Sequence, residues 1–227
     1  MVLLAAPAAA AAKPPVVVEL YTAQGCASCG AANAFIGKLA DRPGVLPLTF
    51  AVDYWDYLGW ADTFAKPEFA QRQKAYVAKL ALREPYTPQV VIDGRAQAAG
   101  QQGDRIEALV RDAARARRDP PDVRFITARR VDVGSGAPPR GGAEVWLIRY
   151  DPRERDVEVK SGDNRGQTIV HKNVVRQIQR LGAWKGRPTA YRLASQPEDG
   201  LATVVLVQAA QGGRVLAVAQ PDGPAQP

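Results

Sequence analysis

Val16-Val17-Val18-Glu19-Leu20-Tyr21-Thr22-Ala23-Gln24-Gly25-Cys26-Ala27-Ser28-Cys29 is the stretch of sequence that decides the fold. Its apolar beginning predicts a buried strand over 16–21, and the two cysteines of the chain follow after a short loop. Apolar residues at helical spacing then predict a helix from Cys29 to about Ala40. Two intervening residues at a helix start allow the sulfurs to bond to each other, and unpaired backbone N–H groups there stabilise a thiolate.

The cysteine spacing predicts thiol–disulfide chemistry, because a strand, a short loop, CxxC and a helix are typical of a thioredoxin-like redox site. Two other interpretations stay open. The pair can be an inert disulfide, although closing so short a loop adds little stability, or it can hold a soft ion such as Cu(I). A zinc site is disfavoured because zinc takes four ligands, and the single histidine, His171, is distant in sequence. No resident metal or cofactor is predicted.

Composition and the N-terminal residues predict an exported globular protein. The chain has 227 residues, of which 46% are apolar and 23% charged. Residues 1–15 resemble the end of a secretory signal, with small residues suited to cleavage near Ala8–Ala12; a disordered, alanine-rich leader is the alternative. An oxidising compartment suits a lone cysteine pair, so a periplasmic or secreted location is expected. No later segment is apolar enough to be a membrane helix.

The first half of the chain alternates strands and helices. After the helix at 29–40, the pattern predicts a strand over Val45–Val52, a helix over Pro67–Leu82, a strand over Gln89–Ile92, a hairpin turn at Asp93-Gly94, a short strand near Arg95–Ala99 and a helix from Asp104. This order, together with CxxC and with Thr87-Pro88 before the hairpin, predicts an α/β thioredoxin-like domain over 16–119 with an inserted helix.

The second half predicts a small antiparallel β domain over 122–219, sandwich-like, because its apolar runs are short and separated by turns. The predicted strands are Val123–Val133, Glu144–Tyr150, Val157–Lys160, Tyr191–Leu193, Leu201–Val207 and Arg214–Ala219. A helix from Lys172 to about Leu181 is expected to interrupt them. Residues 220–227 are expected to form a flexible tail.

The net charge of +7 is carried in part by basic clusters at 115–118 and 129–130. No aromatic interleaving or nucleic-acid motif accompanies them. They are therefore interpreted as solvated surface, and no nucleic-acid partner is expected. The sequence leaves the oligomeric state open.

Three long motifs carry a resemblance to a known family: Glu19–Cys29, Val52–Trp60 and Tyr86–Gly94. With them, and with 170–176 and 181–184 in the second half, the chain resembles the secreted, thioredoxin-like bacterial proteins called domain of unknown function 1223. The resemblance covers nearly the whole predicted mature chain and implies fold and compartment more firmly than activity.

One position departs from this family pattern. Proline is usual after the second cysteine, and Gly30 stands there in this chain. Glycine costs roughly 1 kcal/mol in a helix interior and less in a first turn, so a looser helix start is expected.

Within this scheme, Cys26 would be the nucleophile and the more exposed thiol, and Cys29 would resolve the mixed disulfide. Glu19 is a carboxylate in an apolar strand, at a place similar to the buried acid of thioredoxins. Burial would raise its pKa and suit it to move the proton of Cys29. The alternative is a glutamate at the sheet edge that points to water.

The resemblance also implies a substrate-binding surface. It implies a cis peptide bond at Thr87-Pro88, in a loop that faces the cysteines and presents backbone groups to an extended substrate. Tyr54, Trp55 and Asp56 leave the end of a strand on the same side and would form a wall of the cleft. Alternatively, the aromatic residues of that loop cover the sheet edge and pack under the inserted helix.

Two functions follow from the sequence. The first is an exported thiol–disulfide oxidoreductase that acts through Cys26 and Cys29 on protein or peptide thiols and disulfides, with a redox partner protein. The second is a non-catalytic thioredoxin-like binding or chaperone module, in which the cysteines form a staple or bind Cu(I). His171 is interpreted as structural rather than catalytic.

Overall fold

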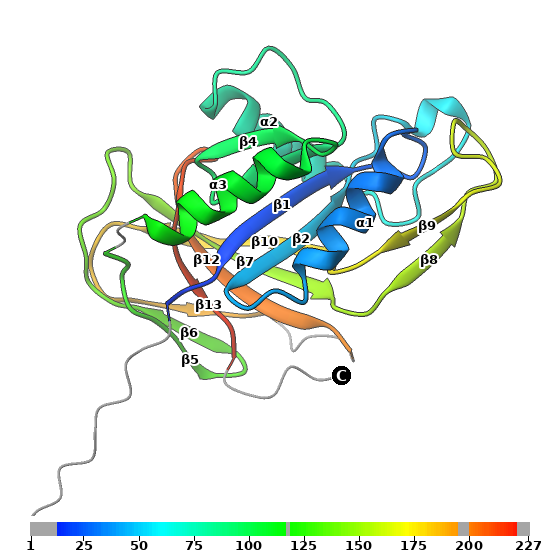
Figure 1. Cartoon of the computed structure of the whole chain (residues 1–227). Coiled ribbons are helices and arrows are strands. Elements are labelled where there is room, and N and C mark those ends of the chain that lie inside the picture. Colours follow the sequence, from blue (N-terminus) through cyan, green and yellow to red (C-terminus); the bar gives the residue numbers. More distant parts are fainter. Residues whose placement is uncertain (1–12, 117–118, 195–199, 222–227) are drawn as a thin grey trace, which may run out of the picture.

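The computed structural model describes residues 13–116, 119–194 and 200–221 (Figure 1). Most of the predicted leader at 1–15 and of the predicted tail at 220–227 therefore lies outside the described residues. The first half forms β1 (Val16–Thr22), α1 (Cys29–Leu39), β2 (Val45–Ala51), η1 (Asp56–Leu58), α2 (Pro67–Lys79), β3 (Gln89–Ile92), β4 (Ala96–Ala99) and α3 (Gly103–Arg115). The second half forms β5 (Val123–Thr127), β6 (Arg130–Val133), β7 (Ala143–Asp151), β8 (Arg155–Glu158), β9 (Thr168–His171), β10 (Val174–Trp184), β11 (Thr189–Arg192), β12 (Ala202–Ala209) and β13 (Val215–Ala219).

Eight strands form one mixed sheet in the order β13-β12-β7-β10-β2-β1-β3-β4. β1 is parallel to β2 and antiparallel to β3, and β3 and β4 form a hairpin. The two halves of the chain join where β10 runs parallel to β2 and Val174 pairs with Thr49. β11, β6 and β5 form a second, antiparallel sheet, and β8 and β9 form a separate hairpin.

Alternate residues of β1 face opposite sides of the sheet, so helices can pack on both sides of it. Figure 1 shows α1 and α3 in front of the first-half strands. The core on that side is built from the following residues: Val16, Val18, Leu20, Ala32, Ile36, Leu39, Val90, Ile92, Ala98, Ile106 and Val110.

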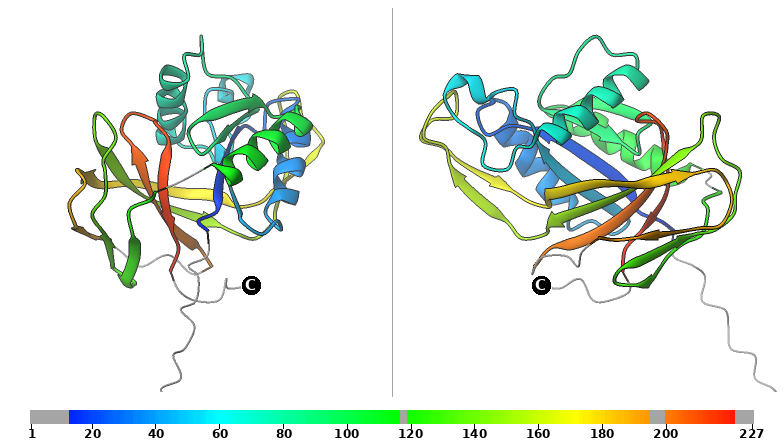
Figure 2. Two further views of the ribbon diagram at one scale, coloured as in Figure 1. Left: turned by 60° about the vertical axis from the view of Figure 1, so that its left-hand side comes forward. Right: turned by 180° about the vertical axis from the view of Figure 1, so that it is seen from behind.

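The other side is covered by α2 and by strands of the second half (Figure 2). Tyr21 of β1 stacks on Phe50 of β2 with ring centroids 5.3 Å apart, and Phe50 meets Phe69 of α2 edge to face at 5.4 Å. The same core includes Ile148, Tyr150, Val175, Val204, Leu206 and Val215. One hydrophobic core is therefore shared by both halves of the chain.

The three-stranded sheet packs on the outer side of β7 and β12. Its core contains Val131, Val133, Val145, Leu147, Trp184, Tyr191, Val205 and Val207. The structure thus confirms a mixed α/β fold with additional antiparallel β elements. The boundary predicted near residue 120 lies between α3 and β5, yet strands from either side of it belong to one sheet and one core.

The helix predicted over Lys172–Leu181 is wrong, because this segment lies in β10 and pairs with β7 along its length. Its register shifts between Val175 and Gln177 and again between Arg180 and Gly182. Such bulges interrupt the alternation of apolar and polar residues by which a strand is recognised. Without that alternation, the apolar residues of this segment have a spacing that also suits a helix.

The hairpin turn predicted at Asp93-Gly94 is confirmed. Both residues have positive φ, 48° and 62°, as a two-residue hairpin turn of this kind requires. The turn also contacts the second half, because the Val215 N–H donates to the Asp93 carbonyl at 2.8 Å. A Cβ atom at Gly94 would lie 2.3 Å from the Gly213 carbonyl oxygen, so only glycine fits.

Candidate functional site

Cys26 and Cys29 form a disulfide at the start of α1. Cys26 lies in the loop after β1, and the backbone N–H of Cys29 donates to its carbonyl oxygen at 3.0 Å. Ser28 occupies the N-cap position without a side-chain capping bond, and its hydroxyl lies 3.9 Å from the Cys26 sulfur. The helix start therefore places unpaired N–H groups beside the cysteines, which favours a thiolate once the bond is reduced.

Both cysteines are buried, with 2% of Cys26 and 0% of Cys29 exposed. The expectation of an accessible Cys26 is wrong for the disulfide form, because a distant segment covers the loop. Asn164, between β8 and β9, donates from Nδ2 to the carbonyl oxygens of Gln24 at 2.8 Å and Cys26 at 2.7 Å. The β8–β9 loop is thus fastened directly to the cysteine loop.

Glycines lie where these two loops meet. A Cβ atom at Gly162, in the β8–β9 loop, would lie 3.8 Å from Cα of Gly25. β9 also packs against the start of α1, since a Cβ atom at Gly30 would lie 3.0 Å from Cδ1 of Ile169. Gly30, which stands where the family pattern has proline, therefore lies against the β8–β9 hairpin.

Gln24, two residues before Cys26, connects the cysteine loop to a second covering segment, residues 53–66. Its Oε1 accepts hydrogen bonds from Trp60 Nε1 at 2.9 Å and from the Thr63 N–H at 3.2 Å. Its Nε2 donates to Thr63 Oγ1 at 3.0 Å. Its backbone N–H donates to Asp62 Oδ2 at 2.7 Å. Gln24 is completely buried, so the three loops form one packed unit.

Asp62 is a buried titratable group of this unit. Burial raises the pKa of Asp62 to about 6. The hydrogen bonds that its carboxylate accepts from the backbone N–H groups of Phe64 and Gln24 lower the pKa and offset part of this rise. Nearby Asp56 raises it further, and Asp56 Oδ1 accepts the Asp62 N–H at 3.1 Å. The carboxyl that supports the cysteine loop is therefore close to half-protonated in mildly acidic solution.

The Thr87-Pro88 peptide bond is cis, as the resemblance implied. Gly100 separates Pro88 from α1, because a Cβ atom at Gly100 would lie 2.7 Å from Pro88 Cβ and 2.8 Å from Ala32 Cβ. Trp55 Nε1 donates to Thr87 Oγ1 at 2.7 Å. The proline loop and the aromatic loop therefore meet beside the first turn of α1.

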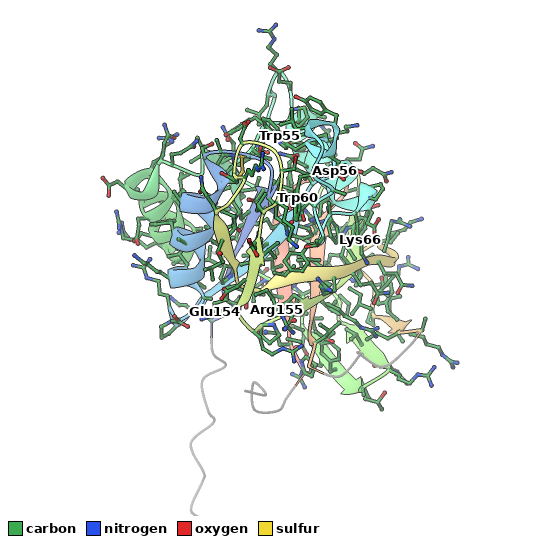
Figure 3. All side chains as sticks on the ribbon, turned by 90° about the vertical axis from the view of Figure 1, so that its right-hand side faces the viewer. Trp55, Asp56, Trp60, Lys66, Glu154 and Arg155 are labelled. Atoms are coloured by element: carbon green, nitrogen blue, oxygen red, sulfur yellow. A yellow bond between two sulfur atoms is a disulfide. The ribbon has the colours of Figure 1, made fainter. Side chains whose placement is uncertain are left out.

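The aromatic loop lies against the cysteine loop and also packs on the core. Trp55 also lies against the cysteine loop, since a Cβ atom at Gly25 would be 3.9 Å from Trp55 Cβ. Tyr54 packs on the core and donates to Gln73 of α2 at 3.1 Å, and burial raises its pKa to about 12. Tyr57 is 78% exposed. Figure 3 shows Trp55, Asp56 and Trp60 at the end of the molecule that the β8–β9 loop reaches.

Glu19 is 1% exposed, so the alternative of a glutamate that points to water is wrong. Its carboxylate faces α2, where Arg72 Nε donates to Oε2 at 2.7 Å and Arg72 Nη2 to Oε1 at 2.8 Å. The hydroxyls of Tyr21 and Tyr76 donate to the same carboxylate at 2.8 and 2.6 Å. Glu19 is thus the acceptor at the centre of a buried network.

This network also reaches the second half of the chain. The Arg72 guanidinium lies over the ring of Trp146 in β7 at 5.7 Å, and Gln208 of β12 donates to Tyr76 Oη at 2.9 Å. The hydrogen bonds that Glu19 forms with described residues go to Arg72, Tyr21 and Tyr76, not to a cysteine. These contacts therefore support a structural role for Glu19, in which it joins the two halves of the chain, at least as directly as a role in proton transfer.

His171, at the end of β9, is 1% exposed, and its ring meets Phe64 edge to face at 5.3 Å. Neither ring nitrogen has a hydrogen-bond partner among the described residues. Burial lowers its pKa to about 4. The ring is therefore neutral at pH 7, and it packs from the hairpin against the loop before α2.

Three residues of the site, Gln24, Asp62 and Asn164, were not predicted from the sequence. Gln24 lies inside the predicted motif and could have been found as a polar residue next to the cysteines. Asp62 and Asn164 gave no comparable signal, because their contacts to Gln24 span 38 and 140 residues of sequence. No group of three or more His, Cys, Asp or Glu residues within 13–116, 119–194 and 200–221 is placed to hold a metal ion.

A family model described as "Protein of unknown function (DUF1223)" matches residues 17–208. The chain belongs to this family. The match extends from β1 into β12, so it includes the cysteine loop and the β8–β9 loop that covers it. No described helix has the length and apolar character needed to cross a bilayer.

Two solved structures are similar to this DUF1223 member. One is a crystal structure of a protein from Agrobacterium tumefaciens, with 29% identity, a TM-score of 0.71, and coverage of 96% of this chain and 99% of that chain. The other is HBP35 of Porphyromonas gingivalis, with 14% identity, a TM-score of 0.56, and coverage of 95% and 79%. The second likeness concerns the fold alone. A comparison with curated proteins gave no match.

Proposed function

We propose that this protein is an exported thiol–disulfide oxidoreductase that acts on protein or peptide disulfides through Cys26 and Cys29. The observation that carries the proposal is the Cys26–Cys29 disulfide at the first turn of α1, beside the cis Thr87-Pro88 bond. A helix N-terminus favours the thiolate that attacks disulfides. Oxidising conditions outside the cytoplasm allow such a pair to cycle.

We further propose that residues 16–115 form a thioredoxin-like unit. The support is the element order β1-α1-β2-α2-β3-β4-α3 and the strand order β2-β1-β3-β4, with β1 and β2 parallel. The strands of the second half extend this sheet beyond β2. Their role in the proposal is to supply the β8–β9 loop that covers the cysteines.

In the proposed reaction, the Cys26 thiolate of the reduced protein attacks one sulfur of a substrate disulfide. The substrate S–S bond breaks, a mixed disulfide forms, and the first substrate thiolate leaves and takes up a proton. The Cys29 thiolate then attacks the Cys26 sulfur and releases the second substrate thiolate. The substrate gains two electrons and the Cys26–Cys29 disulfide is restored. A dithiol partner protein must reduce it again.

Because Cys26 is 2% exposed, a protein substrate reaches its sulfur only after a covering segment moves. The β8–β9 loop is the segment that we assign to this movement, since Asn164 holds it through two side-chain hydrogen bonds. Trp55 and Thr87 would then border the uncovered sulfur and bind the substrate backbone and side chains. In this proposal Glu19 takes no part in the reaction, and its role is to hold the buried hydrogen-bond network together.

The reduction potential tests this function directly. Equilibration with glutathione or dithiothreitol, followed by alkylation, should give a potential of about −120 to −270 mV, where working oxidoreductases lie. Insulin reduction by the full chain should be lost in Cys26→Ser. A potential well below about −300 mV, with no insulin reduction, would identify a structural disulfide and favour the non-catalytic binding module.

A further inference from the structure

A cleft lies where the segment before α2 faces β7 and β10. Its volume is about 730 Å³, within the range of about 300–1,000 Å³ typical of small-ligand sites. Residues 63–68 form one wall, and residues 149 and 176–178 form the other. Figure 3 shows Lys66 on this face, beyond Trp60. The cleft therefore lies between the two halves of the chain.

Positive charge predominates in this cleft. Lys66, Arg149 and Arg176 line it together with a single carboxylate, Glu68, among the described residues. In the part of the chain that the structure describes, Lys66 and Arg176 form no ion pair. An anion in the cleft would thus meet cations whose charge is not already balanced by a paired carboxylate.

Neutral groups hold these cations in place. Lys66 Nζ donates to the Arg176 carbonyl oxygen, and the Arg176 guanidinium lies 4.9 Å above the ring of Phe64. Carbonyl and aromatic partners orient Lys66 and Arg176 without cancelling their charge. These two cations are therefore already arranged before a ligand enters.

The N-terminus of α2 adds to this potential. The helix begins at Pro67 and has 13 residues, and the N-cap residue Lys66 makes no side-chain capping bond. The positive end of the helix dipole therefore lies at the cleft. Phe64, Ala65, Ile178 and Leu201 supply apolar surface in the same cleft. Such a lining accepts an apolar group beside a negatively charged one.

We propose that this cleft binds a small organic oxyanion, a carboxylate or a phosphate carried on an apolar body. Arg176 presents a guanidinium group, which pairs with the planar or tetrahedral oxygens of such anions. Lys66 adds a point charge, and Phe64 and Ile178 contact the apolar body. This binding does not depend on the disulfide chemistry of Cys26 and Cys29.

Isothermal titration calorimetry on the full oxidised chain tests the proposal with four probes: phenyl phosphate, benzoate, benzyl alcohol and inorganic phosphate. We expect saturable 1:1 binding of phenyl phosphate or benzoate, and the stronger of the two identifies the oxyanion. Benzyl alcohol should bind at least about tenfold more weakly, because charge-assisted hydrogen bonds are roughly twice as strong as neutral ones. Inorganic phosphate alone should also be weaker, because it lacks the apolar body.

Arg176→Gln and Lys66→Gln should each weaken the binding by about tenfold. Arg192→Gln is the matched control, since Arg192 is an exposed arginine of β11 that does not line the cleft. It removes the same unit of charge and should leave the affinity unchanged. Circular dichroism melting verifies that each variant is folded. If Arg176→Gln fails to fold, Lys66→Gln alone decides the result.

The proposal is overturned if neither aromatic anion binds saturably below about 10 mM, a free energy near −3 kcal/mol. It is also overturned if benzyl alcohol binds as tightly as the anions. Equal weakening by Arg176→Gln, Lys66→Gln and Arg192→Gln would likewise overturn it, because the effect would then be one of net charge. Each of these results would leave the cations as ordinary solvated surface.

Discussion

The side-chain amide of Asn164 donates to the carbonyl oxygen of Cys26 at 2.7 Å, although the two residues are 138 positions apart in sequence. This bond places the β8–β9 loop over the disulfide. The second half of the chain thus contacts the cysteine loop directly.

Replacing Asn164 by alanine should therefore speed reduction of the disulfide. The change removes both hydrogen bonds to the cysteine loop, and loss of a hydrogen bond to a buried carbonyl group costs about 1–3 kcal/mol. The Cys26 carbonyl keeps its bond from the Cys29 N–H, so the Gln24 carbonyl bears most of the loss. We expect dithiothreitol to reduce Cys26–Cys29 about tenfold faster, equivalent to about 1.4 kcal/mol of easier opening. Alkylation of the released thiols, followed over time by mass spectrometry in native buffer, measures the rate.

Asn173→Gly provides the matched control. Asn173 is also buried and donates from Nδ2 to the Pro47 carbonyl at 2.8 Å, a bond that does not involve the cysteine loop. Its φ of 53° suits glycine. This variant should lose comparable stability and keep the wild-type reduction rate. If both variants speed reduction equally, the disulfide is reached by general unfolding, and Asn164 has no specific role in covering it.

Glu19→Gln should destabilise the fold by about 3–5 kcal/mol, because it leaves the Arg72 guanidinium without its anion in a buried site. Arg72 and Glu19 side chains are only 6% and 1% exposed. Urea unfolding measures the loss. Glu144→Gln is the control, since its ion pair with Arg180 is half-exposed, with side-chain exposures of 48% and 21% for Arg180 and Glu144, and should contribute less than about 1 kcal/mol.

The same Glu19 variant separates the two roles considered for this residue. A proton-transfer role predicts slower disulfide exchange across pH 6–9 in the fraction that remains folded. A network role predicts normal exchange by the folded fraction and lower stability. A fall in exchange without a fall in stability would restore Glu19 to the reaction.

His171 should make the protein sensitive to acid. Its folded pKa of about 4 lies below the ordinary histidine value of 6.5, so between these two pH values the unfolded chain binds the proton and the folded chain does not. Stability is then lost as the pH falls from about 6.5 to 4, by an amount on the order of 3 kcal/mol. Asp62 acts in the opposite sense, because its raised pKa makes the folded state bind a proton more tightly.

Comparing wild type with His171→Phe isolates this contribution, since the Asp62 contribution is common to both proteins. Phenylalanine keeps a ring against Phe64 and cannot be protonated. The difference in unfolding free energy, variant minus wild type, should rise steadily as the pH is lowered from 6.5 to 4. A difference that is independent of pH would show that His171 titrates normally in the folded state.

Local signals in the sequence were enough to predict much of the first half. The apolar run before Cys26, the helical spacing after Cys29 and the Asp93-Gly94 turn each depend on neighbouring residues, and each was found where expected. The prediction of an interrupting helix at 172–181 failed because two bulges disrupt the alternation of β10. Strand pairing, which overrode the helical spacing, depends on residues far away in the chain.

The candidate site was predictable only in part for the same reason. Cys26, Cys29 and the cis Thr87-Pro88 bond were predicted from motifs. Asn164 has no motif, and its contact to Cys26 depends on how the β8–β9 hairpin packs on α1. The partner of Glu19 was equally hidden, because Arg72 lies 53 residues away on a helix whose sequence looks amphipathic.

Ending the chain at Asp119 should abolish cooperative folding. The cut would remove β10 from the edge of β2 and expose core residues such as Phe50 and Tyr76, which pack with strands of the second half. It would also remove Gln208, which donates to Tyr76 at 2.9 Å. Far-ultraviolet circular dichroism and urea titration of the 13–119 fragment should show no cooperative transition. Mixing it with the 120–227 fragment should restore one, because the two pieces together carry the whole shared core. A fragment 13–119 that unfolds cooperatively by itself, with Cys26–Cys29 as resistant to dithiothreitol as in the full chain, would contradict both the shared core and the covering role of the β8–β9 loop.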